Sequence, residues 1–304
     1  MKFEKLRISV VIPTFNRCHT LERALDSVFK QSFKPYEIIV VDNGSADGTV
    51  SMITKNYPSV KLLFEKKLGV SAARNLGIKL SKGNWIAFLD SDDEWNDKKL
   101  ERQIICNSNN EKPLRLIHTN EIWKKNSVIK NQMEKHKKAG GNIFVACLSL
   151  CCISPSSSLI RKDVFRDVGY FDENIPACED YDFWLRFCAR EEVLFVDENL
   201  IVKHGGHSDQ LSQKYWGMDR FRVYSLEKLL QTLEHSSENY RVTFNMLITK
   251  LNVLINGGLK RKNTSLVSFY NRKKEFWLRS DKLCRNTSEI KVAKLREASS
   301  YYFE

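Results

Sequence analysis

Three aspartates and a glutamate crowd into the segment FLDSDDEW at residues 88–95. Asp90 and Asp92 form a D-x-D element, and Asp93 and Glu94 follow it directly. The apolar residues just before predict that these carboxylates leave the end of a buried strand. Carboxylates in this pattern can accept hydrogen bonds from a ribose, and they can bind a hard divalent cation that shares oxygen ligands with a diphosphate. Such a cation would neutralise the charge of a departing nucleoside diphosphate. An acidic surface turn has the same residues, so the position after a strand is what favours a site.

A second acidic pair, Glu179 and Asp180, opens the segment EDYDFWLR, which we predict to be a helix. One of the two could take a proton from an attacking hydroxyl group. Alternatively, the pair is only an N-terminal charge that the helix dipole favours. His204 ends the predicted strand NLIVKH, and His207 follows three residues later. Either imidazole could join a metal or diphosphate site, and a loop histidine without such a role is the alternative.

Strands and helices that must position these residues alternate along the first hundred residues. Apolar, β-branched runs predict strands at 8–15, 37–42, 60–65 and 84–90, and helical spacing predicts helices at 20–30, 45–57 and 69–81. This order indicates βαβ units in a mainly parallel sheet flanked by helices. Ligands of such sheets bind beyond the carboxyl ends of the strands. Asp42, Asp90 and Asp92 all lie at predicted strand ends.

The rhythm changes after about residue 100. The polar residues 107–142 predict irregular structure with edge strands, and residues 193–204 predict a strand, a turn and a second strand. Residues 208–211 follow in a loop that could close over a ligand. From about residue 216 onward the pattern is helical. We find no internal repeat.

The composition of the 304 residues is typical of a globular protein, with 42% hydrophobic residues. No apolar run reaches ~18 residues, and the N-terminus lacks the apolar core of a signal peptide, so we expect a cytoplasmic protein. Its eight cysteines include no C-x-x-C pair. We therefore expect reduced thiols, with Cys147, Cys151 and Cys152 acting as packing residues rather than metal ligands.

Positive charge is concentrated at the C-terminal end. From residue 250 onward there are 13 lysines and arginines against 5 acidic residues, so 8 of the 12 net positive charges lie there. Such a segment suits an anionic membrane, a phosphorylated acceptor or nucleic acid, or it is simply a solvated helical surface. The stretch FYNRKKEFWLR mixes aromatic and basic residues, but no nucleic-acid-binding module surrounds it. We therefore expect no nucleic-acid partner.

Six segments occur in a characteristic order: IPTFNR, VVDNGSADGT, GVSAARNLGI, FLDSDDEW, VGYFDE and ACEDYDFWLR. Over residues 7–207 the chain resembles the family 2 glycosyltransferases, which are inverting enzymes of the GT-A fold. The resemblance implies a Rossmann-like, mainly parallel sheet with a helical C-terminal extension. It also implies Mn²⁺ or Mg²⁺ as cofactor, a nucleotide-sugar donor (a UDP-sugar) and a glycan or lipid-linked acceptor. The product would be a surface polysaccharide or glycolipid, made in the cytoplasm or peripherally at the inner face of an anionic membrane.

The same resemblance implies a domain organisation. A catalytic domain would span residues 1–213, with a nucleotide-sugar half at about 1–100 and an acceptor half at about 101–213. A helical, basic region would follow at 214–304.

The resemblance also assigns roles to individual residues. Asp42 would contact the base and Asp90 the ribose, while Asp92 would hold the metal together with His204. Asp180 would be the general base, with Glu179 as the alternative. The other expected nucleotide-sugar-binding residues are Pro13, Thr14, Phe15, Arg17, Arg74, Ser91 and Asp93, the last of which contacts the donor sugar or supports the site.

Three other functions are alternatives to this one. A nucleotidyltransferase would need a glycine-rich, basic loop after the first strand, which IPTFNRCHT does not provide. A nucleic-acid-binding protein could use the basic C-terminus. A non-catalytic relative would not be expected to retain Asp90, Asp92 and Asp180.

Overall fold

The computed structural model describes residues 6–126, 128–206 and 214–286. These residues form two compact units. Of the described residues, unit 1 contains 6–126, 128–143 and 151–206, and unit 2 contains 144–150 and 214–286. His207 and the loop at 208–211 lie outside the described residues, so their expected roles stay predictions.

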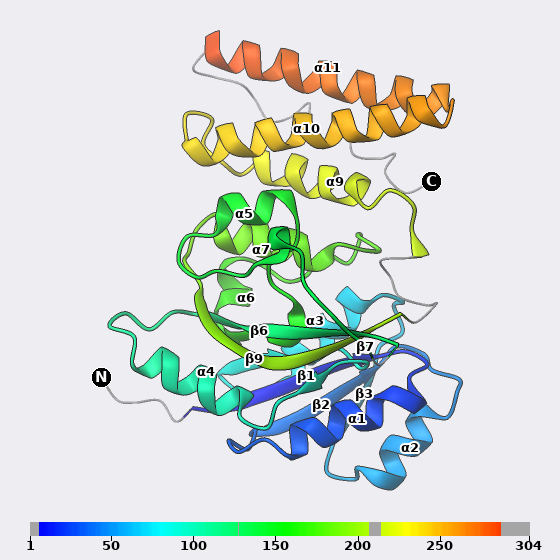
Figure 1. Ribbon diagram of the computed structural model, residues 1–304, viewed down its shortest axis with the longest axis vertical. Helices are drawn as coiled ribbons and strands as arrows, with labels where there is room; N and C mark the ends of the chain where they lie inside the picture. Colours follow the sequence, from blue (N-terminus) through cyan, green and yellow to red (C-terminus); the bar gives the residue numbers. More distant parts are fainter. Residues whose placement is uncertain (1–5, 127, 207–213, 287–304) are drawn as a thin grey trace. The chain divides into compact units, whose positions relative to one another are not determined.

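Unit 1 is built on a nine-stranded sheet with the order β3-β2-β1-β4-β8-β6-β9-β5, in which β7 pairs with β6 (Figure 1). The strands are β1 (Ile8–Thr14), β2 (Glu37–Asp42), β3 (Lys61–Phe64), β4 (Trp85–Phe88), β5 (Glu94–Trp95), β6 (Leu116–Lys125), β7 (Val128–Lys130), β8 (Leu159–Arg161) and β9 (Leu194–Gly205). β1 to β4 are parallel, as predicted. β8 is antiparallel to both β4 and β6, so the sheet as a whole is mixed.

Alternation along the first strands gives the sheet two apolar faces. Ile8, Val10 and Ile12 of β1 pack against the helix α1 (Cys18–Phe29), whose buried apolar residues recur at every third or fourth position. On the other face a second helix lies so close that a Cβ at Gly77 would stand 2.4 Å from a methyl carbon of Val11. Only glycine permits this approach. The helices of the first half are α1 (Cys18–Phe29), α2 (Thr49–Asn56), α3 (Val70–Leu80) and α4 (Lys99–Ser108).

Two expectations for the second half of unit 1 are wrong. β6 lies inside the sheet between β8 and β9, whereas the polar composition of 107–142 predicted irregular structure and edge strands. β9 is one continuous strand, whereas a turn was predicted within it. The register of β9 against β6 shifts on both sides of Asn120, and these irregularities accommodate the polar residues there without ending the strand. The remaining helices of unit 1 are the short 3₁₀ turns η1 (Glu134–His136) and η2 (Pro155–Ser157), with α6 (Val164–Asp167) and α7 (Glu179–Cys188).

Unit 2 is helical, as the pattern after residue 216 predicts. Its helices are α5 (Phe144–Ser149), α9 (Asp219–Leu230), α10 (Glu238–Lys260) and α11 (Thr264–Asn286). A buried carboxylate, Glu227 of α9, accepts hydrogen bonds from Lys273 at 3.2 Å and from the indole of Trp277 at 2.8 Å, both on α11. In the described part of the chain, none of the helices has the length and apolarity to cross a membrane.

Candidate active site

The carboxyl ends of β1 and β2 form the first part of the site. Thr14 and Asp42 are register partners at these ends, and both are buried. Asp42 Oδ2 accepts the backbone N–H groups of Gly44 and Ser45, each at 3.1 Å. Asp42 Oδ1 and the Thr14 hydroxyl are also buried, yet neither has a hydrogen-bond partner among the described residues. Because a buried acceptor without a donor is costly, this end of the sheet is suited to a ligand that donates a hydrogen bond.

The neighbouring residues shape this position. Pro13 is buried in β1, whereas Phe15 is 50% exposed just beyond it. The backbone N–H of Arg17, at the start of α1, donates to the Thr49 hydroxyl at 3.1 Å. The sequence did not single out Asn43, whose side chain binds the backbone of residues 65, 67 and 69 at 2.7–2.9 Å. These bonds fix the loop after β3 beside the unsatisfied carboxylate oxygen of Asp42.

Arg74 joins the two acidic segments that lie far apart in the sequence. Its guanidinium, on α3, donates to Asp90 Oδ1 at 2.7 Å and to Glu179 Oε1 at 2.6 Å. Arg74 is 3% exposed, and its guanidinium stands 5.4 Å from the ring centre of Phe171. Burial acts to lower the pKa of Arg74, but the two carboxylates raise it overall. Its charge is therefore permanent.

The D-x-D segment holds its carboxylates in different surroundings. Asp93 is buried, and its oxygens accept from the Ser156 hydroxyl at 2.6 Å and the backbone N–H of His204 at 3.3 Å. Both oxygens are thus engaged, which favours the supporting role over contact with a sugar. Ser91 is also buried. The half-buried carboxylate of Asp92 makes no hydrogen bond or ion pair with another described residue. Burial and the charge of Asp90 raise the pKa of Asp92.

His204 lies beside this segment, but its ring faces another carboxylate. Its Nε2 stands 3.1 Å from Oε2 of Glu94. Burial lowers the pKa of His204, so the imidazole is held towards its neutral form. In residues 6–126, 128–206 and 214–286, no three His, Cys, Asp or Glu side chains are grouped closely enough to hold a metal ion. Among the described carboxylates of the D-x-D segment, that of Asp92 is the one without a hydrogen bond or ion pair to another residue.

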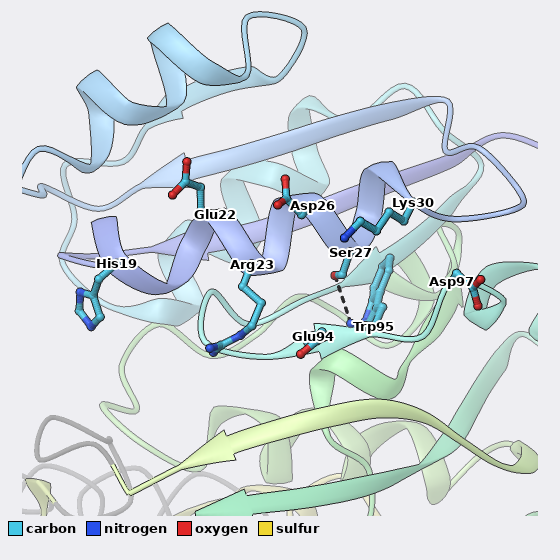
Figure 2. Close-up of a pocket in the computed structure, with 9 residues that line it drawn as sticks. All are labelled: His19, Glu22, Arg23, Asp26, Ser27, Lys30, Glu94, Trp95 and Asp97. Carbon is cyan, nitrogen blue, oxygen red and sulfur yellow. Dashed lines mark hydrogen bonds between the residues drawn. The ribbon is translucent and has the colours of Figure 1, made fainter. Parts of the chain in front are cut away.

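A polar pocket of about 370 Å³ lies beside α1 and the D-x-D segment (Figure 2). None of the predicted site residues lines it. Its residues instead hold the backbone of the D-x-D segment in place. The guanidinium of Arg23 donates to the carbonyl oxygen of Asp92 at 2.6 Å, and Ser27 Oγ accepts the backbone N–H of Trp95 at 3.1 Å. Glu94, also in the lining, holds His204. We therefore place the candidate site at the strand ends rather than in this pocket.

The second acidic pair occupies the first turn of α7. Cys178 precedes it with a left-handed backbone (φ 63°), a conformation that is strained for a residue with a side chain. Glu179 is 6% exposed and bound to Arg74, and burial raises its pKa. Asp180 is half-buried instead. Its Oδ1 accepts the N–H of Tyr181 at 2.7 Å, and its Oδ2 stands 3.2 Å from the sulfur of Cys151. Of the pair, Asp180 is the more accessible carboxylate.

A lysine that the sequence did not single out, Lys203, interacts electrostatically with both the D-x-D segment and Asp180. Burial acts to lower the pKa of Lys203, on β9, but surrounding carboxylates raise it overall. These carboxylates belong to Glu121, Asp93, Asp90 and Asp180. Glu121 of β6 is itself paired with the buried Lys138 at 2.8 Å, and despite its burial these two lysines lower its pKa to about 2. In the sequence, only the position next to His204 could have drawn attention to Lys203.

Comparisons with known proteins bear on this arrangement. The family model described as "Glycosyl transferase family 2" matches residues 9–169. An uncharacterized glycosyltransferase of Rickettsia bellii is 31% identical over 213 residues, which are 68% of this chain but only 31% of that protein. Escherichia coli WfgD, a UDP-Glc:alpha-D-GlcNAc-diphosphoundecaprenol beta-1,3-glucosyltransferase, is 34% identical over 150 residues, 47% of this chain and 58% of its own. The chain thus spans less than two thirds of either relative.

Two solved structures share the fold at low identity. S. aureus TarS 1-349 in complex with UDP-GlcNAc has a TM-score of 0.60 at 16% identity, covering 90% of this chain and 92% of that one. The mannosyltransferase PcManGT of Pyrobaculum calidifontis, in complex with GDP-Man and Mn²⁺, has a TM-score of 0.58 at 13% identity, covering 91% and 85%.

Proposed function

This chain belongs to glycosyltransferase family 2 and has the GT-A fold that its sequence predicted, and from that premise we propose that it transfers a sugar from a nucleotide-sugar donor to an acceptor hydroxyl with inversion at the anomeric carbon. The observation that carries the proposal is the double ion pair of Arg74. It ties Asp90, at the nucleotide end of the sheet, to Glu179, next to the candidate base Asp180. The same buried arginine would therefore position both the donor site and the proton acceptor.

We assign the nucleotide to the ends of β1 and β2. The unsatisfied Oδ1 of Asp42 would accept the N3–H of a uracil ring, and the exposed ring of Phe15 lies at the same strand end. Uracil offers this donor, which supports a UDP-sugar. TarS was solved with UDP-GlcNAc, whereas PcManGT was solved with GDP-Man, so both bases need testing.

A divalent cation fits the free carboxylate of Asp92. Mg²⁺ and Mn²⁺ bind through one or two carboxylates together with substrate phosphates and water, and this set does not require three protein ligands. When bound, the cation would stabilise the negative charge of the leaving diphosphate. His204 would join only after its ring leaves Glu94. His207 remains the alternative ligand.

The transfer needs one proton acceptor. In our proposal the acceptor oxygen attacks the anomeric carbon, and the bond from that carbon to the diphosphate oxygen breaks with its electron pair staying on the diphosphate. Oδ2 of Asp180 takes the hydroxyl proton. Arg74 keeps Glu179 occupied, so Glu179 orients the pair rather than acting as the base. The charge of Lys203, which the neighbouring carboxylates stabilise, would also attract the diphosphate.

The acceptor and the location are proposed from a relative and from the distribution of charge along the chain. WfgD acts on a lipid-linked diphosphate sugar, which supports a glycan or lipid-linked acceptor and a role in polysaccharide synthesis. The basic segment after residue 250 supports peripheral contact with an anionic membrane. The predicted division at residue 213 between a catalytic and an accessory region remains part of the proposal.

The test is a donor screen on the purified protein. Release of nucleoside diphosphate from UDP-, GDP- and dTDP-sugars is measured with Mn²⁺ and with excess chelator, in the presence of lipid-linked and free sugar acceptors. Asp180→Asn should lower transfer by roughly 10²–10⁴-fold while calorimetry shows unchanged UDP binding. The proposal fails if no donor is consumed, and the assignment of the base fails if Glu179→Gln abolishes transfer while Asp180→Asn does not.

A further inference from the structure

Cys151 contacts the candidate base directly. Its Sγ stands 3.2 Å from Asp180 Oδ2 and 3.1 Å from the carbonyl oxygen of Ile153. The residue is half-buried and lies in the same unit as Asp180. The sequence predicted only a packing residue at this position. A thiol is a hydrogen-bond donor, however, and here it stands between two oxygen acceptors.

We propose that Cys151 is a positioning residue that orients the carboxylate of Asp180 as the base of the transfer, an inference that rests on the proposed function. A thiol has a single hydrogen, so it cannot satisfy the Asp180 carboxylate and the Ile153 carbonyl fully at once. An ionised carboxylate is the stronger acceptor of the two. Before transfer, the S–H group therefore points to Asp180 Oδ2 and fixes the orientation of this carboxylate.

The alternative acceptor matters once the proton has moved. When the acceptor O–H bond breaks and the proton joins Asp180 Oδ2, that oxygen no longer attracts the thiol hydrogen strongly. The hydrogen can then turn to the carbonyl of Ile153, 3.1 Å away. Oδ1 stays bound to the N–H of Tyr181 in either state. The geometry thus selects Oδ2 as the oxygen that receives the proton.

The test compares two substitutions with a neighbour. Cys151→Ala removes the donor, Cys151→Ser replaces it with a hydroxyl, and Cys152→Ser is the control because Cys152 is adjacent and also half-buried. We expect Cys151→Ala to lower kcat roughly three- to tenfold at pH 7, because a thiol is a weak donor. KM for the donor and UDP binding should stay at the parental value. Cys151→Ser should restore kcat, and Cys152→Ser should not change it.

The outcomes separate the two proposals. A parental enzyme that consumes no donor refutes the proposed function and this inference with it. An active parent whose Cys151→Ala variant keeps the parental kcat refutes only this inference. Equal losses of kcat in the alanine and serine variants, with lower melting temperatures, would make Cys151 a packing residue and would also overturn it.

Discussion

Arg74→Met should destabilise unit 1 as well as weaken donor binding. The substitution removes two charge-assisted hydrogen bonds of 2.7 and 2.6 Å and leaves Glu179, 6% exposed, without its counter-charge. Removal of one partner from a buried ion pair costs about 3–5 kcal/mol, because the remaining charge stays desolvated. At roughly 2–4 °C per kcal/mol for a unit of this size, the melting temperature should fall by about 6–20 °C.

Two further variants make this prediction specific to the pair. Arg74→Lys keeps a point charge that cannot satisfy both carboxylates in the way that the planar guanidinium does, so its melting temperature should be intermediate. In the double variant, Glu179→Gln removes the stranded charge. We expect it to recover on the order of 1–3 kcal/mol of the loss caused by Arg74→Met.

The measurement is thermal unfolding followed by circular dichroism, alongside calorimetric UDP binding. A matched control is Arg102→Met, which removes an exposed ion pair with Glu198 and should leave the melting temperature nearly unchanged. The reasoning is wrong if Arg74→Met melts within 2 °C of the parent, or if Glu179→Gln adds its own loss without any recovery.

Three other outcomes are expected. Asp92→Ala should abolish transfer without lowering the melting temperature, and excess chelator should do the same to the parent; full activity in chelator would refute the metal role. Burial lowers the pKa of His118 to about 3, so the unfolded state binds more protons between pH 6.5 and 3 and stability falls as the pH falls through that window. The loss from pH 7 to pH 4 should be about 3 kcal/mol in urea titrations and should disappear in His118→Gln. In low salt the full chain should sediment with anionic vesicles more than with neutral ones; equal binding would remove the membrane proposal.

The first half of the fold was predictable because its signals are local. The buried alternation of Ile8, Val10 and Ile12 and the stripe of α1 each follow from a short window of sequence. The residues at the strand ends, Asp42 and Asp90, follow from the same pattern, because parallel strands end at one edge. Family recognition and fold class were confirmed for this reason.

The second half was not predictable because its stability comes from distant partners. Glu121 and His118 give β6 a polar appearance, yet both are buried in the sheet. Glu121 is tolerated there because Lys138, 17 residues away, pairs with it at 2.8 Å. No window around β6 reveals that pairing. The contact between Cys151 and Asp180 spans 29 residues and was equally invisible in the sequence.

In this chain of net charge +12, the buried acidic residues meet positive charge within the site itself. The compensation is local: Arg74 neutralises Asp90 and Glu179, and Lys203 acts on Asp93 and its neighbours. Asp92 makes no hydrogen bond or ion pair with another described residue, and Arg17 and Lys203 act on it only through their charge. Its carboxylate therefore stays open at the point where a cation and a diphosphate would have to meet.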